Sequence, residues 1–159
     1  HDHTSTKKCR SVLHGVSLLI VIQIMYGAFA AGLKAGYFYN TYPKMGPDWF
    51  PQSALMLPSF MNNVINNPIM VQWIHRWLAV IAFLGVAWLW RQIRSESNIA
   101  LQYAGLIMFS TVCIQFLLGI LTLMSRVWLP FALMHQLGAL IVVASVVICY
   151  HYTRSRRPV

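Results

Sequence analysis

The chain has 159 residues, of which 58% are hydrophobic, and its mean hydropathy is +0.59. This composition is typical of a membrane protein and excludes an ordinary soluble domain. Twelve Lys and Arg residues against three acidic residues give a formal net charge of +9, but they gather at the ends of apolar segments. Such a distribution indicates membrane topology, so we expect membrane lipid and no nucleic acid as a partner.

Four apolar stretches are long enough to cross a bilayer, which requires about 20 residues in a helix. They cover residues 12–33, 70–90, 99–124 and 129–151. The sequence therefore predicts an all-α membrane protein with a single four-helix domain over residues 1–159. The four helices form two helical hairpins, and one long outer loop over residues 34–69 joins the first helix to the second.

The basic residues predict how the four helices are oriented. Eight of them flank the apolar segments at one end of the bundle: Lys7, Lys8, Arg10, Arg91, Arg94, Arg154, Arg156 and Arg157. Because positive charges collect on the inner side of a membrane, we expect both termini inside. The other four lie at the outer side or its boundary: Lys34, Lys44, Arg76 and Arg126.

The long loop is rich in aromatic and turn-forming residues, which suit the headgroup layer of a bilayer. Within it, residues 53–65 (SALMLPSFMNNVI) are expected to lie flat in the interface as a short amphipathic piece, despite Pro58.

A weak internal repeat relates the two hairpins. The first segment contains IQIMYG (22–27) and the third contains IQFLLG (114–119), and in each a Gln is followed four residues later by a Gly. The next segment in each case carries a histidine, His75 or His135. This pattern predicts a duplicated helix pair with a pseudo-twofold axis along the membrane normal and a shared site at the interface of the repeats. Chance similarity between apolar segments is the alternative for so short a match.

His75 and His135 are ionisable groups inside apolar segments, where such groups are costly and usually functional. Each follows the apparent start of its segment, Met70 or Pro130, by five residues, so both lie at the same depth near the outer side. Two neutral imidazoles facing each other in a helix bundle are the ligands of a b-type haem. We predict one haem b per chain with His75 and His135 as axial ligands of its iron. The alternative is a hydrogen bond from each histidine to a neighbouring helix.

Arg76 and Arg126 are the predicted partners of the haem propionates, because an arginine forms a bidentate pair with a carboxylate and the apolar segments contain no acid. The alternatives are snorkelling of Arg76 to the headgroups and an ordinary solvated loop charge for Arg126. The buried amides of Gln23 and Gln115 are expected to form hydrogen bonds between helices.

A second pair of histidines, His14 and His151, lies at the inner ends of the first and last segments. They raise the alternative of a two-haem transmembrane electron carrier. Because a histidine at the membrane interface has a low free-energy cost, its presence there does not indicate a ligand, and we rank this alternative last.

Several stretches together closely resemble the haem A synthase family. They are GAFAAGLKAGYFYNTYPKMGPDWFP (27–51), NNPIMVQWIHR (66–76), QFLLGILTL (115–123) and LPFALMHQLGAL (129–140). Members of that family hydroxylate and oxidise a methyl group of haem O to make haem A for cytochrome oxidase. They typically have eight spans in two similar four-helix halves, and this chain resembles the C-terminal half. The resemblance implies that this half holds an auxiliary b-type haem, with His75 and His135 as its ligands.

Two positions depart from the family pattern. The catalytic half of the family carries Glu-x-x-His-Arg, whereas this chain has Gln72 three residues before His75. The loop motif usually reads Gly-Leu-Asp-Ala-Gly, and here Lys34 replaces the Asp. An amide cannot serve as a carboxylate that transfers protons or stabilises positive charge, so we expect no catalysis from this chain alone.

The resemblance implies a half-length, haem A synthase-like protein that serves haem A formation and cytochrome oxidase assembly as the cofactor-holding half. Its partner would be a separately encoded catalytic half or a second copy of the chain. The alternative is a non-catalytic accessory subunit of cytochrome oxidase or of a respiratory supercomplex. Either role places the chain in a mitochondrial inner membrane or a bacterial cytoplasmic membrane.

Overall fold

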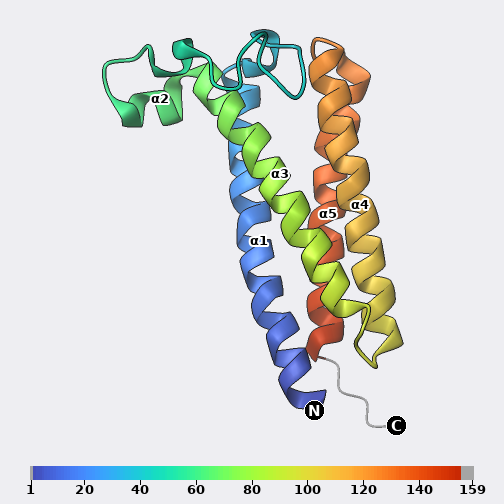
Figure 1. Ribbon diagram of the computed structural model, residues 1–159. Coiled ribbons are helices and arrows are strands. Elements are labelled where there is room, and N and C mark those ends of the chain that lie inside the picture. Colours follow the sequence, from blue (N-terminus) through green and yellow to red (C-terminus); the bar gives the residue numbers. More distant parts are fainter. Residues whose placement is uncertain (1, 155–159) are drawn as a thin grey trace.

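Four long helices form the bundle in the computed structural model, which describes residues 2–154 (Figure 1). They are α1 (Asp2–Gly32), α3 (Pro68–Ile93), α4 (Ile99–Met124) and α5 (Leu129–Arg154). Each contains a stretch of at least 24 residues that is long and apolar enough to cross a membrane. The predicted fold class, an all-α membrane protein with a four-helix bundle, is confirmed.

The helices are arranged as two hairpin pairs. Helix α1 packs mainly on α3, and α4 packs mainly on α5, while α3–α4 and α1–α5 contacts join the two pairs. Helices α3 and α5 therefore lie diagonally across the bundle. Both run from the end that carries residues 33–67 and 125–128, here called the loop end, to the end where α1 begins and α5 finishes, here called the terminal end (Figure 1).

Asparagine caps explain where two of the long helices begin. The Asn67 side chain accepts from the backbone N–H of Ile69, and Pro68 occupies the first helical position, where a missing N–H costs nothing. The Asn98 side chain accepts from the N–H of Leu101 at the start of α4. These caps start α3 two residues before the predicted span and start α4 at the predicted residue.

The buried apolar core occupies the terminal half of the bundle. Its fully buried members come from all four long helices and include Leu13, Val86, Leu89, Ile93, Met108 and Cys149. In the loop half, by contrast, no side chain is buried in residues 21–32, 113–124 or 129–141. Figure 1 shows the same division in the backbone, because the α1–α3 pair stands apart from the α4–α5 pair near the loop end.

The outer loop contains two short 3-10 helices, η1 (Ala35–Tyr37) and η2 (Gln52–Leu55), and the helix α2 (Phe60–Asn66). Figure 1 shows α2 projecting sideways from the bundle. The segment expected to lie in the interface is thus two helical pieces interrupted around Pro58, and it exposes large apolar side chains. These are Leu55, Met56, Phe60, Met61 and Ile65.

A buried amide network fixes this half of the loop to the start of α3. The Asn63 side chain donates to the carbonyls of Leu57 and Ser59 and accepts from the N–H of Leu57. Asn67 donates to the carbonyls of Ser53 and Ala54 and to the Asn63 Oδ1. Since these bonds pair both side-chain nitrogens and oxygens with several partners, the network satisfies buried polar groups that would otherwise be costly.

Close contact between α3 and α4 depends on Gly105. A Cβ at this position would lie 2.8 Å from Ile93 Cγ2 and 3.1 Å from Trp90 Cε3. We therefore expect Gly105→Ala to destabilise the bundle by about 1–3 kcal/mol, because the added methyl group overpacks the contact. The matched control is Gly15→Ala on α1, where a Cβ would meet nothing within 4 Å. Thermal unfolding in detergent measures the stability of both variants. Equal unfolding midpoints would contradict the role of Gly105 in the contact between α3 and α4.

Candidate functional site

Both histidines of the repeat pack against a glycine of the preceding long helix. A Cβ at Gly27 of α1 would lie 3.1 Å from Cε1 of the His75 imidazole on α3. A Cβ at Gly119 of α4 would lie 3.0 Å from Cε1 of the His135 imidazole on α5. Each imidazole thus occupies space that any larger residue would fill, and each does so within its own hairpin pair.

The glutamines of the repeat lie beside the same histidines. Gln23 Nε2 is 3.4 Å from His75 Nε2, and because an amide nitrogen only donates, the imidazole Nε2 accepts and its Nδ1 carries the proton. Gln115 Nε2 donates to the backbone carbonyl of His135 at 2.7 Å. Both glutamines form the predicted hydrogen bonds between helices. The sequence repeat is therefore a repeat in space, with a Gln and a Gly of one helix flanking a His of the next.

The two imidazoles lie at similar depths on diagonally opposed helices. His75 is seven residues after the start of α3 at Pro68, and His135 is six residues after the start of α5 at Leu129. At 1.5 Å per residue these positions are about 10 and 9 Å from the loop end of their helices.

Unpaired polar atoms concentrate around these histidines. Six buried side-chain atoms in the described part of the chain have no hydrogen-bond partner: Gln23 Oε1, Gln72 Oε1, His75 Nδ1, Arg76 Nε, Gln115 Oε1 and His135 Nδ1. All belong to the loop half of the bundle, where water is scarce and an unsatisfied polar group is costly. A cluster of this kind is a common mark of a place where a ligand or ordered water completes the structure.

Arg76 holds the outer loop onto α3. Its guanidinium donates from Nη1 to the carbonyls of Thr41 and Lys44, at 2.7 and 3.2 Å, and from Nη2 to the carbonyl of Tyr39, at 2.8 Å. Gln72 Nε2 donates to the same Tyr39 carbonyl at 3.0 Å. The predicted propionate partner thus has its terminal nitrogens on loop carbonyls, and its Nε is unpaired.

Trp73 reinforces this attachment. Its indole N–H donates to the carbonyl of Trp49 at 2.8 Å, and its ring stands edge-on against Phe50. A pocket of about 220 Å³ lies beside the attachment, between the loop and α3. It is lined by Tyr42, Pro43, Trp49, Arg76, Trp77 and Val80. Residues 39–50 therefore form a cover over the start of α3 that side chains of the helix fix through backbone carbonyls.

Arg126 lies in the turn between α4 and α5, at the same end of the bundle. Its φ is +55°, in the left-handed region, and its side chain is exposed. The next residue, Val127, contacts the outer loop so closely that a Cβ at Gly36 would lie 2.6 Å from its Cγ2. Arg126 thus belongs to a turn that packs on the loop.

The second pair of histidines does not enter the bundle. His14 and His151 are both exposed near the terminal end. His14 Nδ1 donates to the carbonyl of Arg10 at 2.6 Å, and its ring stands edge-on against Tyr150. His151 stands edge-on against its neighbour Tyr152. This arrangement does not favour a second haem between these helices.

The sequence motifs around the site are shared with a defined family. The family model COX15-CtaA, described as cytochrome oxidase assembly protein, matches residues 1–147 of the chain. The chain belongs to this family. The resemblance to haem A synthases found in the sequence is thereby confirmed.

Curated relatives named haem A synthase match most of the chain. The protein of Rhizorhabdus wittichii is 38% identical over 137 residues, which are 84% of this chain and 38% of that protein. The protein named haem A synthase COX15 from Bos taurus is 34% identical over 154 residues, covering 88% of this chain and 35% of that protein. Its counterpart from Homo sapiens is 35% identical, covering 82% and 32%.

The chain spans between about a third and two fifths of the length of these relatives. No solved structure matches it. The relatives come from bacteria and mammals, which agrees with the expected bacterial cytoplasmic or mitochondrial inner membrane, as do the four candidate spans.

The attachment of the loop by Arg76 is open to a direct test. We expect Arg76→Gln to speed tryptic cleavage after Lys44 by about tenfold or more, because hydrogen bonds from a charged donor contribute about 1.5–3 kcal/mol and three are lost. Arg126→Gln, an exposed arginine at the same end, is the control and should leave the rate unchanged. Limited proteolysis in detergent measures both, and equal rates in Arg76→Gln and the native chain would show that other contacts hold the loop.

Proposed function

We propose that the chain binds one b-type haem between α3 and α5, with His75 and His135 as the axial ligands of its iron. The single observation that carries the proposal is the pair of imidazoles at similar depth on diagonal helices, each packed on a glycine. Among the described residues there is no group of three or more His, Cys, Asp or Glu side chains that could hold a metal ion. Iron in a porphyrin already has four nitrogen ligands, so two axial imidazoles complete its coordination.

The residues present fit such a group in three further respects. The loop half has no buried apolar side chain on the inner surfaces of α1, α4 and α5, so a flat apolar macrocycle would supply the missing core. The His75 Nε2 lone pair accepts from the Gln23 amide, and iron would take the place of that hydrogen bond. The oxygens of Gln23 and Gln115 are unpaired, and an amide oxygen is able to accept from an imidazole N–H, as ligand histidines generally require.

Arg76 and Arg126 would bind the propionates of that haem at the loop end. Arg126 is exposed, and its guanidinium can form a bidentate pair with a carboxylate. Arg76 offers its unpaired Nε, while its terminal nitrogens keep the loop in place. The same side chain would then link the cofactor to its cover.

A bound b-type haem would supply one-electron oxidation and reduction at its iron. The chain itself offers no carboxylate beside His75, because position 72 is Gln where the family motif has Glu. The Gln72 amide instead donates to the Tyr39 carbonyl. The chain would therefore serve haem A formation and cytochrome oxidase assembly by holding the cofactor. A separate catalytic half, or a second copy of the chain, would provide the residues that act on haem O.

Replacing either axial ligand tests the site. We expect His75→Ala and His135→Ala to abolish low-spin haem binding. Two axial imidazoles keep haem iron in the low-spin state, and the iron leaves that state when one of them is removed. His14→Ala, an exposed histidine at the other end, should retain one haem per chain. Absorption spectra and the pyridine haemochrome assay on purified protein give the content. A native chain with no haem signal would sink the proposal, and equal haem in all three variants would refute the ligand assignment.

A carboxylate at position 72 tests the proposal that this chain holds the cofactor and does not itself act on haem O. We expect Gln72→Glu in residues 1–159 to produce no haem A from haem O, because one carboxylate beside His75 does not supply a second four-helix unit. The variant is expressed in cells that make haem O. Their haems are then extracted and separated by chromatography, which measures the haem A content. Haem A formed by this single variant would show that the chain is catalytic and that we have assigned it to the wrong half.

A further inference from the structure

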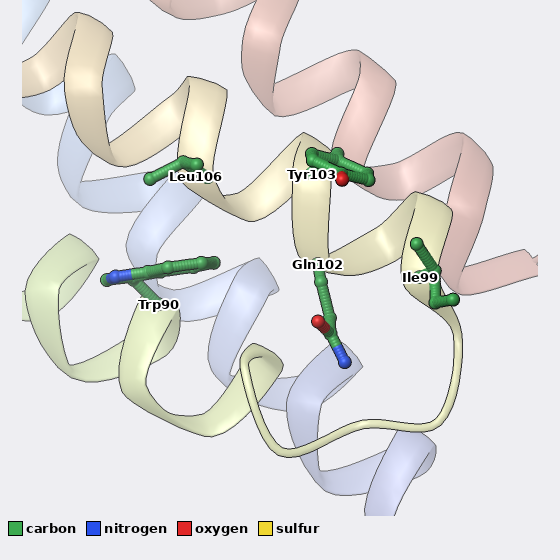
Figure 2. A pocket seen from close by; sticks show the side chains of 5 residues that line it. All are labelled: Trp90, Ile99, Gln102, Tyr103 and Leu106. Atoms are coloured by element: carbon green, nitrogen blue, oxygen red, sulfur yellow. The ribbon is translucent and has the colours of Figure 1, made fainter.

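A groove lies between α3 and α4 near the terminal end, far from the histidines. Its volume is about 340 Å³, and it is lined by Trp90, Ile99, Gln102, Tyr103 and Leu106. Figure 2 shows Trp90 on α3 opposite Gln102 and Leu106 on α4, with the turn between the two helices below them. Three of the α4 residues are exposed, namely Ile99 at 66%, Tyr103 at 64% and Leu106 at 42%. The groove is thus on the outer surface of the bundle, where helices of a membrane protein meet lipid.

The walls of the groove are held firmly by the contact between the helices. The Trp90 ring packs against Gly105, where a Cβ would lie 3.1 Å from Cε3. Gln102 Nε2 donates to the backbone carbonyl of Glu96 at 2.7 Å, which ties α4 to the turn. These contacts fix the Trp90 side of the groove relative to the α4 side, which contains Ile99, Tyr103 and Leu106.

Two arginines lie at the C-terminal end of α3, the helix that contributes Trp90 to the groove, and have no acidic partner in the described part of the chain. Arg94 follows Trp90 by four residues, so it lies on the same face of α3 one turn nearer the helix end. Arg91 is in the same last turn, and both side chains are exposed. Within residues 9–153 the two acids are Asp48, in the outer loop, and Glu96, which is buried and accepts from Cys9 Sγ.

We propose that this groove binds an anionic phospholipid from the leaflet at the terminal end. One acyl chain lies along Trp90 and Leu106, and the phosphate is held by Arg94 and Arg91. Trp and Tyr side chains are suited to this depth because their rings collect at the boundary between headgroups and hydrocarbon. Basic pockets between transmembrane helices bind anionic headgroups through the same combination of apolar walls and uncompensated positive charge.

Charge complementarity separates this ligand from the other lipids of a membrane. A zwitterionic phosphatidylcholine would bring its own positive charge to two arginines, so it gains little from them. An anionic headgroup is attracted by about 1 kcal/mol for each arginine near the surface, which is about fivefold in affinity. The site is independent of the haem proposal, since none of its residues contacts His75 or His135.

The test compares two lipids on purified protein that contains residues 1–159. Native mass spectrometry in mixed micelles measures the retention of phosphatidylglycerol and of phosphatidylcholine. We expect phosphatidylglycerol to be retained preferentially, and the double variant Arg91→Gln/Arg94→Gln to bind it about 25-fold more weakly. The matched control is Lys34→Gln/Lys44→Gln, which removes two charges at the loop end and should leave retention unchanged.

A second variant distinguishes lipid binding in the groove from attraction of the headgroup by the two arginines alone. Leu106→Trp fills the groove while both arginines remain, and we expect it to abolish the preference for phosphatidylglycerol. Ile99→Trp, at the other end of the lining, repeats the test if the first variant unfolds in detergent. Equal retention of the two lipids by the native chain would overturn the proposal. Unchanged retention in the arginine variant, or in a folded groove-filling variant, would do so as well.

Discussion

The loop half of this bundle depends on one constraint, namely that polar side chains within apolar helices need partners that the bilayer does not supply. The glutamines bond to the neighbouring helix, the arginine bonds to loop carbonyls, and each imidazole packs on a glycine. These bonds still leave six buried atoms unpaired. All six belong to the loop half of the bundle. The part of the bundle with the fewest buried apolar side chains is thus also the part with the most unpaired polar atoms, and the haem that we propose there would contribute to both.

The terminal half supplies the stability that such a loop half requires. Its core draws buried side chains from all four helices, and Gly105 brings α3 and α4 into close contact. Because this contact fixes the helices near one end, the two hairpin pairs can stand apart near the other without losing their relative orientation (Figure 1). A bundle packed tightly along its whole length would leave no space for the haem that we propose, and one packed at neither end would not keep His75 and His135 at similar depths.

Apolar length made the membrane-spanning helices predictable, to the residue for α4 and within two residues for the start of α3, whereas α1 begins ten residues before the predicted segment. The repeat of Gln and Gly before each His was also visible in the sequence, and the structure gives it meaning. The sequence did not indicate that the neighbour of Gly27 is the His75 imidazole. The attachment of the loop could not be predicted, because Arg76 binds backbone carbonyls and every residue has one. The Asn63–Asn67 network was hidden for the same reason.

The exchange of Glu for Gln at position 72 changes what its neighbour Arg76 can do. In this chain two donors, the Gln72 amide and the Arg76 guanidinium, converge on the Tyr39 carbonyl. A carboxylate has no proton to donate to that carbonyl, so it would turn to the arginine one helical turn away and compete with the loop for it. Glutamine therefore frees Arg76 to hold the loop, and it removes the group that could move a proton beside His75. One residue thus accounts both for the attachment of the loop and for the lack of a carboxylate beside His75, which agrees with the role that we propose for the chain.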